Sequence, residues 1–450
     1  MVPNADNRSF PQVRVALAGF GTVGREVVRL LQEEELRYRE QLGIDLRLVT
    51  ILDRSYREKD TSGIHSEVRF TDSVSEFLQA PSDVIVELLG GSDPADQIIR
   101  TGLEQQKAVV TANKLLMAQS GKDYLALANQ NDTYLGFEAS VAGAIPIIRV
   151  LRRSLFSDRI VGVRGILNGT CNFILSEMGD NGLEYEEALS QAQSLGYAEA
   201  DPTLDVSGAD TTDKLAILSA IAFKAVVPPQ QIATQGVTEI KPVDLLYAQK
   251  LDSNIKLLGV AVKNSDHLCL RVSPFLISNR LPLSNVSGVL NAVEITGSSA
   301  GSVVLSGRGA GGAPTAVSVT SDILNAALWK KGAKPSASQS TSQRSSTAGE
   351  GDSGPSDSKP ISDKDERYPF FIRFIVKDRP GIIAELANIL AERKINIDSV
   401  LEESGSDSSN LPFIITVKPI LFSTIQEAVG QMKALDFNQV PPLVLPMLQE

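Results

Sequence analysis

The chain has 450 residues, 42% of them hydrophobic, which is long and apolar enough for two or three folded domains. Two cysteines and two histidines exclude a disulfide framework and argue against thiolate or histidine metal clusters, so Lys, Asp and Glu must supply acid–base chemistry. The net charge of −11, without a compensating basic block, argues against nonspecific nucleic-acid binding and favours small-molecule chemistry. A polar N-terminus and the lack of a long apolar run predict no signal peptide and no membrane span, so we expect a cytoplasmic protein.

The first third of the chain alternates short apolar strands with helix-like segments. A helix is expected at residues 23–34, directly after the first strand. Alternation of this kind predicts a parallel, doubly wound sheet. The expected strands span residues 13–18, 46–52, 84–89 and 108–111.

A glycine-rich turn, Gly19-Phe20-Gly21-Thr22-Val23-Gly24, joins the first strand to the first helix. There the first glycine permits a tight turn, the second lets the backbone approach a pyrophosphate, and the third lets helix and strand pack closely. The alternative is a turn without a ligand. After the second strand, Asp53 could bind a ribose 2′-hydroxyl, or Arg54 could pair with a 2′-phosphate, so NAD and NADP both stay open.

Two later strands end in polar turns, and ligands of open α/β sheets bind at the carboxyl ends of strands. Gly90-Gly91-Ser92 follows one strand, and Thr111-Ala112-Asn113-Lys114 follows the next. We expect Ser92 and Lys114 to contact the cofactor or the substrate. The alternative for Lys114 is a surface lysine that begins a helix.

One segment, from Gly196 to Lys214, combines five carboxylates with a single lysine at its end. If a helix starts between Val206 and Asp210, then Asp210 and Lys214 lie four residues apart on one face. A lysine among acids could then face a substrate. The alternative is a solvated helix start with a local ion pair. The carboxylates are Glu199, Asp201, Asp205, Asp210 and Asp213.

After residue 145 the alternation weakens, which predicts a second, more mixed sheet in a substrate or dimerisation domain. Its expected strands are residues 160–167, 268–274 and 302–306. From 331 to 365 the composition turns to Ser, Gly, Pro, Gln and charge. This predicts a flexible linker between two independently folding units.

Six spaced motifs resemble the homoserine dehydrogenases, in the family's order and over nearly all of residues 13–328. The resemblance implies reversible reduction of L-aspartate 4-semialdehyde to L-homoserine by NADP or NAD, on the route to threonine, methionine and isoleucine. Spacing alone supports only a nicotinamide-dependent oxidoreductase. The motifs are Gly19–Gly24, Thr111–Lys114, Glu138–Pro146, Gly165–Thr170, Gly196–Pro202 with its continuation to Lys214, and Gly307–Thr315.

The resemblance also assigns roles to the charged residues. Lys214 matches the family's proton donor, and Asp210 would orient that lysine or the substrate hydroxyl. An ammonium group beside the aldehyde oxygen stabilises the negative charge that forms there. Glu199 would bind the substrate's own ammonium, with Asp205 as a second acid, and Lys114 would bind the cofactor.

The turn from Glu138 to Ile145 matches the family's site for a monovalent cation, usually sodium. The resemblance implies ligation by the carbonyls of Val141, Gly143 and Ile145, with Glu138 as a further candidate. Hard oxygen ligands on an irregular turn suit such an ion. The alternative is a structural turn before a helix.

The tail resembles an ACT domain of βαββαβ pattern, with Asp378-Arg379-Pro380-Gly381 as its strand-to-helix turn. Such domains pair and bind amino acids, which implies feedback by threonine in a homodimer or homotetramer. Glu402-Glu403 stands where the matching segment commonly ends in glutamine. A dimerisation module without an effector site is therefore the alternative.

Together these patterns predict an α/β protein that acts on a small molecule, without nucleic acid or membrane. Two other functions stay open: a nicotinamide-dependent dehydrogenase of another amino-acid-derived carbonyl, and a non-catalytic amino-acid sensor. The expected domains are a Rossmann-like NAD(P)-binding domain (1–145, with a return segment near 305–330), an α+β substrate and dimerisation domain (146–304), a linker (331–367) and a ferredoxin-like ACT domain (368–450).

Overall fold

The computed structural model describes residues 10–264, 267–332, 366–402 and 410–449. The described chain divides into two compact units. One contains the described residues up to 157 together with 308–332, and the other contains 158–307 together with the described residues from 366 onward. Within these residues, no helix has the length and apolar character that a membrane span requires.

The first unit is built on a six-stranded parallel sheet of order β3-β2-β1-β4-β5-β6. The sequence predicts this doubly wound sheet, and the strand order reverses between β1 and β4. The strands are β1 (Gln12–Ala18), β2 (Asp45–Leu52), β3 (Arg69–Thr71), β4 (Val84–Glu87), β5 (Ala108–Thr111) and β6 (Leu135–Gly136). The helices are α1 (Thr22–Glu33), α2 (Glu35–Leu42), α3 (Val74–Gln79), α4 (Ala95–Glu104), α5 (Lys114–Gln130), α6 (Ile147–Arg149) and α12 (Gly312–Lys330).

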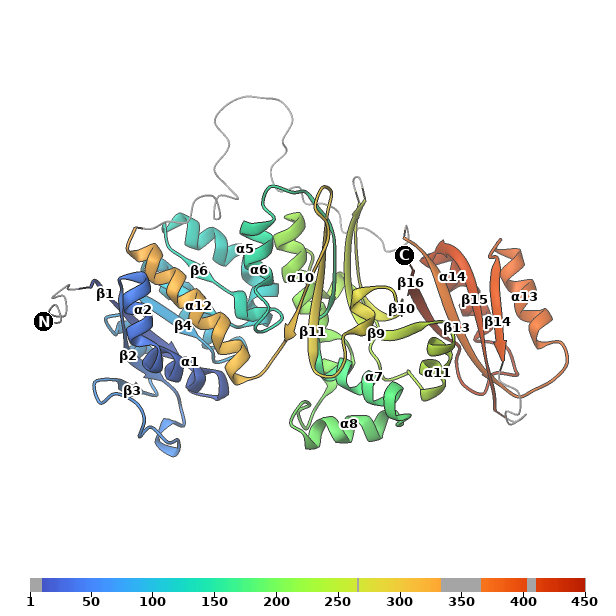
Figure 1. The fold of residues 1–450 in the computed structure, drawn as a ribbon, viewed down its shortest axis with the longest axis horizontal. Helices are drawn as coiled ribbons and strands as arrows, with labels where there is room; N and C mark the ends of the chain where they lie inside the picture. The colour runs from blue at the N-terminus through green and yellow to red at the C-terminus, as the bar shows by residue number, and fades with distance from the viewer. Residues whose placement is uncertain (1–9, 265–266, 333–365, 403–409, 450) are drawn as a thin grey trace, which may run out of the picture. The chain divides into compact units, whose positions relative to one another are not determined.

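The apolar runs of this unit form strands because helices cover both faces of its sheet. Every residue of β4 and β5 is buried, as expected for the centre of a parallel sheet. One hydrophobic cluster joins Leu17 of β1 and Val27 of α1 to Val319 and Ile323 of α12. Helix α12, drawn in orange beside α1 in Figure 1, therefore completes a fold that begins about three hundred residues earlier.

The second unit contains one mixed sheet of order β12-β11-β7-β9-β10-β16-β13-β15-β14, and β8 pairs with β10. Its strands are β7 (Ile160–Ile166), β8 (Ala233–Thr234), β9 (Ser253–Asn264), β10 (His267–Ser278), β11 (Leu290–Gly297), β12 (Gly301–Arg308), β13 (Arg367–Val376), β14 (Ile397–Glu402), β15 (Leu411–Leu421) and β16 (Leu443–Leu448). Its helices are α7 (Gly169–Asn181), α8 (Tyr185–Ser194), α9 (Thr203–Val206), α10 (Ala209–Phe223), α11 (Pro242–Lys250), α13 (Ile382–Glu392) and α14 (Phe422–Met432). The C-terminal order β13-α13-β14-β15-α14-β16 confirms the predicted βαββαβ pattern.

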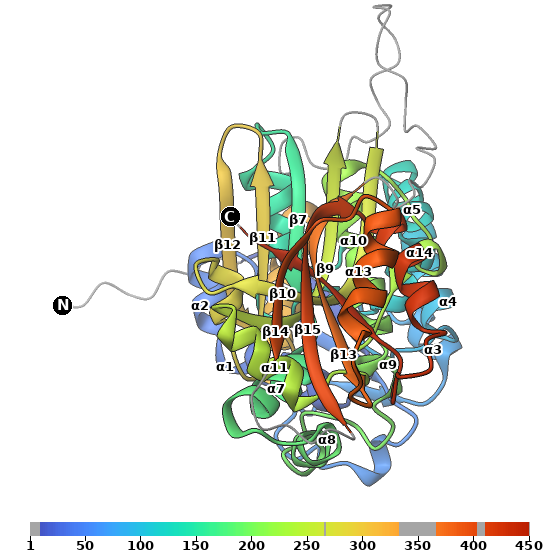
Figure 2. The same ribbon diagram turned by 90° about the vertical axis from the view of Figure 1, so that its right-hand side faces the viewer.

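The tail differs from the expectation of an independently folding unit, because its strands extend the sheet of the middle domain. Strand β16 pairs in parallel with β10, with Leu276 opposite Met447, and antiparallel with β13 on its other side. Figure 1 shows β16 beside β10, and Figure 2 shows β13, β14 and β15 of the tail facing the viewer. Residues 333–365 of the predicted linker lie outside the described residues.

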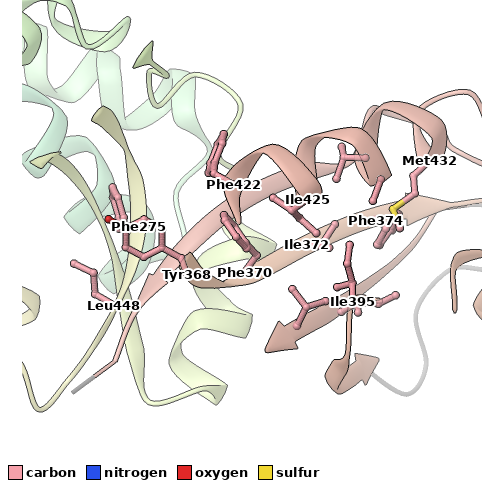
Figure 3. Packing of buried hydrophobic residues seen from close by; sticks show 14 of the residues in the cluster. Phe275, Tyr368, Phe370, Ile372, Phe374, Ile395, Phe422, Ile425, Met432 and Leu448 are labelled. Atoms are coloured by element: carbon pink, nitrogen blue, oxygen red, sulfur yellow. The ribbon is translucent and has the colours of Figure 1, made fainter. Parts of the chain in front are cut away.

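A single hydrophobic cluster runs through this joined sheet (Figure 3). Phe275 of β10 contacts Tyr368 of β13 edge to face, and Tyr368 and Phe422 in turn pack on Phe370. Leu258 of β9 belongs to the same cluster. Sequence periodicity marks the apolar residues of each strand, but it does not reveal which distant strand they meet.

A buried ion pair also connects the two parts of this unit. The Arg373 guanidinium on β13 lies 2.9 Å from Asp244 Oδ1 on α11, and the side chains are 3% and 0% exposed. Arg373 also donates to the Glu239 carbonyl, and Asp244 accepts the Lys241 N–H at the start of α11. Burial raises the pKa of Asp244, and Arg373 opposes that shift. Removing the arginine would leave a buried carboxylate without its cation.

We therefore expect Arg373→Met to lower the free energy of unfolding by about 3 to 5 kcal/mol. Urea unfolding followed by circular dichroism would measure the loss. Arg379→Met is the matched control, because Arg379 pairs with Glu385 and Asp436 on an exposed surface of the same domain. That control should lose about 1 kcal/mol or less. Equal losses in the two variants would contradict a structural role for the buried pair.

Candidate active site and cofactor-binding turns

Lys214 and Asp210 form the centre of the candidate active site in the second unit. Both lie on α10, which begins at Ala209, within the predicted range, and they are one helical turn apart. Lys214 Nζ lies 2.6 Å from Asp210 Oδ2, and it also donates to the Leu167 carbonyl at 2.7 Å. The Asp210 side chain is 3% exposed and that of Lys214 is 12% exposed. The carboxylate is thus the buried anchor, and the ammonium is the group that can reach a ligand.

Asn168 connects this ion pair to Asp205, and the sequence alone marks it only as part of the Gly165–Thr170 motif. Its Nδ2 donates to Asp205 Oδ1 at 2.7 Å and to Asp210 Oδ2 at 2.9 Å. Its Oδ1 accepts the N–H of Cys171 and so caps α7. One amide therefore holds two carboxylates and a helix end in place.

Glu199, the predicted ligand of a substrate ammonium, is exposed on the loop between α8 and α9. This loop is fixed to the rest of the site by Thr170, whose hydroxyl donates to the Tyr197 carbonyl at 2.6 Å. Phe173 also packs edge to face on the Tyr197 ring. The structure thus brings Asp205, Asp210 and Lys214 together, and it leaves Glu199 facing solvent on an anchored loop.

The glycine-rich turn of the first unit fits a pyrophosphate. A Cβ on Gly19 would lie 2.6 Å from the Leu88 carbonyl oxygen, and one on Gly24 would lie 2.0 Å from the Gly19 carbonyl oxygen, so neither position accepts a side chain. Gly21 faces open space, with nothing within 4 Å of such an atom. No side chain caps the first turn of α1, whose N–H groups are therefore available to an anion.

The Asp53 carboxylate is not free to bind a ribose hydroxyl, because protein donors already occupy it. Its carboxylate accepts the N–H of Phe20 and the Lys59 ammonium on Oδ2, and the N–H and hydroxyl of Ser55 on Oδ1. Burial raises its pKa, but Lys59 and these N–H groups outweigh burial and bring the pKa below its usual value. A carboxylate has about four lone-pair sites, so a ribose hydroxyl would have to displace a protein donor. Arg54 beside it is exposed.

The other residues predicted to bind the cofactor differ in how far their side chains are buried. The Phe20 side chain is buried and packs on Phe70, so only its backbone belongs to the turn. Thr22 and Ser92 are exposed, while Val23 and Lys114 are half-buried. Lys114 is the first residue of α5.

The predicted cation turn is irregular, with left-handed φ angles of 56° at Ala142 and 52° at Gly143. The Gly143 carbonyl accepts the Ser318 hydroxyl, and the Ile145 carbonyl accepts the Ile147 N–H, which leaves each of these oxygens one lone pair. Among the described residues, no group of three or more acidic, cysteine or histidine side chains could hold a metal. Any ion here would thus depend on backbone oxygens.

The Glu138 side chain has a structural task at this turn. Its two carboxylate oxygens accept the N–H groups of Ile148 and Arg149, at 2.8 and 3.0 Å. Burial, followed by the neighbouring Asp322 carboxyl, raises the pKa of Glu138 to about 7. Its carboxylate thus caps a helix start, and each of its two oxygens keeps one lone pair.

Three family models match the chain. The NAD-binding domain of homoserine dehydrogenase matches residues 19–138, the homoserine dehydrogenase domain matches 146–324, and the ACT domain matches 370–435. A homoserine dehydrogenase of Pseudomonas aeruginosa is 35% identical over 426 residues, 94% of this chain and 96% of the relative. One of Bacillus subtilis is 36% identical over 407 residues, 90% of this chain and 91% of the relative.

Solved structures give the same match. A homoserine dehydrogenase from Thiobacillus denitrificans superposes with a TM-score of 0.87 at 32% identity, covering 98% of this chain and 100% of that one. A hyperthermophilic archaeal homoserine dehydrogenase in complex with NADPH superposes with a TM-score of 0.61 at 28% identity, covering 70% of this chain and 98% of that one.

Proposed function

This chain belongs to the homoserine dehydrogenase family, and we propose that it reversibly reduces L-aspartate 4-semialdehyde to L-homoserine in threonine, methionine and isoleucine biosynthesis. The observation that carries the proposal is the Lys214 ammonium, which a buried carboxylate and a strand-end carbonyl hold in one place. The nicotinamide cofactor supplies the hydride when it is bound to the glycine-rich turn.

Lys214 supplies the proton in this proposal. Negative charge develops on the aldehyde oxygen as its carbon accepts hydride, and a fixed ammonium stabilises that charge and then protonates it. Asp210 and the Leu167 carbonyl keep Nζ in position, so little reorganisation is needed at the moment of reaction. In the reverse direction the same nitrogen takes the proton from the homoserine hydroxyl.

Acidic side chains would bind the substrate's α-ammonium. Asp205, oriented by Asn168, and Glu199, on the loop anchored through Tyr197, are the two candidates. A salt bridge from each would distinguish an amino-acid aldehyde from an uncharged one.

We expect Lys214→Met to lower kcat by about a hundredfold or more while the cofactor still binds. The assay follows absorbance at 340 nm with aspartate 4-semialdehyde, and cofactor fluorescence measures binding. Lys263→Met, an exposed lysine at the end of β9, is the matched control and should keep full activity. A folded wild-type protein that binds the cofactor without turnover would instead favour an amino-acid sensor. Turnover only with another amino-acid-derived carbonyl would reassign the substrate.

We further propose that the cofactor is NADP. Protein donors already occupy the lone pairs of Asp53, and two cations, Arg54 and Lys59, lie beside it. A 2′-phosphate would complement these cations, whereas a 2′-hydroxyl would compete for Asp53. The NADPH complex of the archaeal relative is consistent with this preference.

Arg54→Ala should then raise the KM for NADPH by about tenfold or more and change the KM for NADH little, because only NADPH carries the phosphate. Initial rates with both cofactors measure the two constants. Arg57→Ala is the control on the same loop, since Arg57 is exposed and pairs with Asp72. Equal effects of Arg54→Ala on both cofactors would contradict phosphate recognition.

We propose that a sodium ion binds the turn after Glu138 through the carbonyls of Val141, Gly143 and Ile145. The left-handed pair Ala142-Gly143 turns successive carbonyls out of regular structure, where they can share an ion. Replacing sodium chloride by tetramethylammonium chloride at equal ionic strength should lower turnover, and sodium should restore it. Unchanged turnover after exhaustive dialysis would contradict the site.

We also propose that an amino-acid effector, threonine, acts through the ACT domain of a homodimer or homotetramer. Two contacts connect this domain directly to the middle domain. Strand β16 pairs with β10, and Arg373 forms an ion pair with Asp244 on α11. Threonine should inhibit the wild type and inhibit Arg373→Met less. Equal inhibition of both proteins would show that the Arg373–Asp244 pair does not transmit the signal. If threonine does not inhibit the wild type, threonine is not the effector. Sedimentation velocity distinguishes a homodimer from a homotetramer.

A further inference from the structure

A fully buried carboxylate, Glu87, stands at the end of β4 beside the proposed cofactor contacts. Its relative exposure is 0%, and it pairs across the parallel ladder with Thr111, the last residue of β5. The two strands diverge into separate turns after these residues. One turn carries Ser92 and the other carries Lys114.

Glu87 accepts hydrogen bonds from the turn after β4 and from the last residue of β5. Oε1 accepts the N–H groups of Leu89 and Gly90, at 2.8 and 3.3 Å. Oε2 accepts the hydroxyl of Thr111 at 2.6 Å. The carboxylate therefore joins the first turn of the loop after β4 to the last residue of β5.

Asn113 closes the connection from the other side. Its N–H donates to the Thr111 hydroxyl oxygen at 3.0 Å, and its Nδ2 donates to the Gly91 carbonyl at 2.8 Å. Its Oδ1 accepts the Leu116 N–H and caps α5. The result is a ring of hydrogen bonds through Glu87, Thr111, Asn113 and the glycine turn, directly before Lys114.

The chemistry of the position explains why a charged residue stands in an apolar strand. Gly90 and Gly91 have left-handed φ angles of 71° and 68°, so their peptide groups leave the sheet. A carboxylate accepts several donors and brings no donor of its own, whereas a glutamine would set an NH₂ group against an N–H or a hydroxyl. Burial raises the pKa of Glu87, and the Thr111, Leu89, Gly90 and Asn113 donors counteract that shift.

We propose that Glu87 is a positioning residue that fixes the turns of Ser92 and Lys114 relative to one another and so sets cofactor binding and turnover. This inference rests on the proposed function, and it concerns a residue that touches neither substrate nor cofactor. Glu87 acts through the placement of the turn that carries Lys114 at the start of α5.

The test is Glu87→Gln against Asp83→Asn. Asp83 precedes the same strand at its amino end, where its carboxylate accepts the Arg14 N–H and guanidinium. Each variant removes a carboxylate that accepts backbone N–H groups at one end of β4. Only Glu87 lies at the carboxyl end of the strand, beside the proposed cofactor contacts. We expect Glu87→Gln to raise the KM for NADPH and lower kcat, together by about tenfold to a hundredfold, and Asp83→Asn to leave both constants unchanged.

A double-mutant cycle separates positioning from general stability. In a Lys114→Met background, Glu87→Gln should cost much less activity than in the wild type, because the group it places is gone. If Glu87→Gln fails to fold, Thr111→Val replaces it in the test. This variant removes the hydroxyl that donates to Glu87, and it should also raise the KM for NADPH and lower kcat. Unchanged constants in the folded Glu87 variant, or full additivity with Lys114→Met, would overturn the inference. NADPH fluorescence titration keeps the test valid if the proposed aldehyde is not turned over.

Discussion

The amide of Asn168 is the contact on which the geometry of the candidate active site depends. It donates both hydrogens of Nδ2 to carboxylates from two different helices, α9 and α10, and its oxygen caps a third, α7. Two carboxylates brought close together repel one another unless donors or cations lie between them. The Asn168 amide supplies the donors and Lys214 supplies the cation, so the two carboxylates are held in a fixed arrangement around one ammonium.

The first unit organises its turns in a related way. Asp53, Glu87 and Glu138 each accept backbone N–H groups at a point where the chain leaves a strand or enters a helix. Such N–H groups have no partner in regular structure, and a buried carboxylate satisfies several of them at once. The proposed ligand contacts lie on these same turns. They are therefore held in place before any ligand arrives, which lowers the entropy lost on binding.

Features set by nearby residues could be predicted from the sequence, and features set by distant ones could not. The spacing of Asp210 and Lys214 places them on one helix face, and the glycine turn after an apolar strand gives the nucleotide fold, because both depend on a few neighbouring residues. The roles of Asn168 and Glu87 depend on which helices and strands become neighbours. A lone charge within the apolar run 84–89 was the available signal for Glu87. The four donors on Asp53 come partly from a loop whose path no local pattern encodes.

The same distinction explains the tail. Its βαββαβ order is a local property and was predicted, whereas the parallel pairing of β16 with β10 joins segments far apart in the chain and leaves no periodic trace. The expectation of an independently folding tail followed from the composition of the linker. Shared core residues such as Phe275 and Tyr368 could not be recognised as partners before the strands were placed.

The pairing of β16 with β10 has a consequence for how the protein is made. During synthesis β10 leaves the ribosome well before β16, so the edge that β16 will cover is open while the rest of the chain is still being translated. Open edges and uncovered apolar faces are where nascent chains associate wrongly. Closing this sheet also requires contacts of high sequence separation, which form slowly. The middle domain can therefore reach its final state only after translation of the tail, and chaperones that bind extended apolar strands have that interval in which to act.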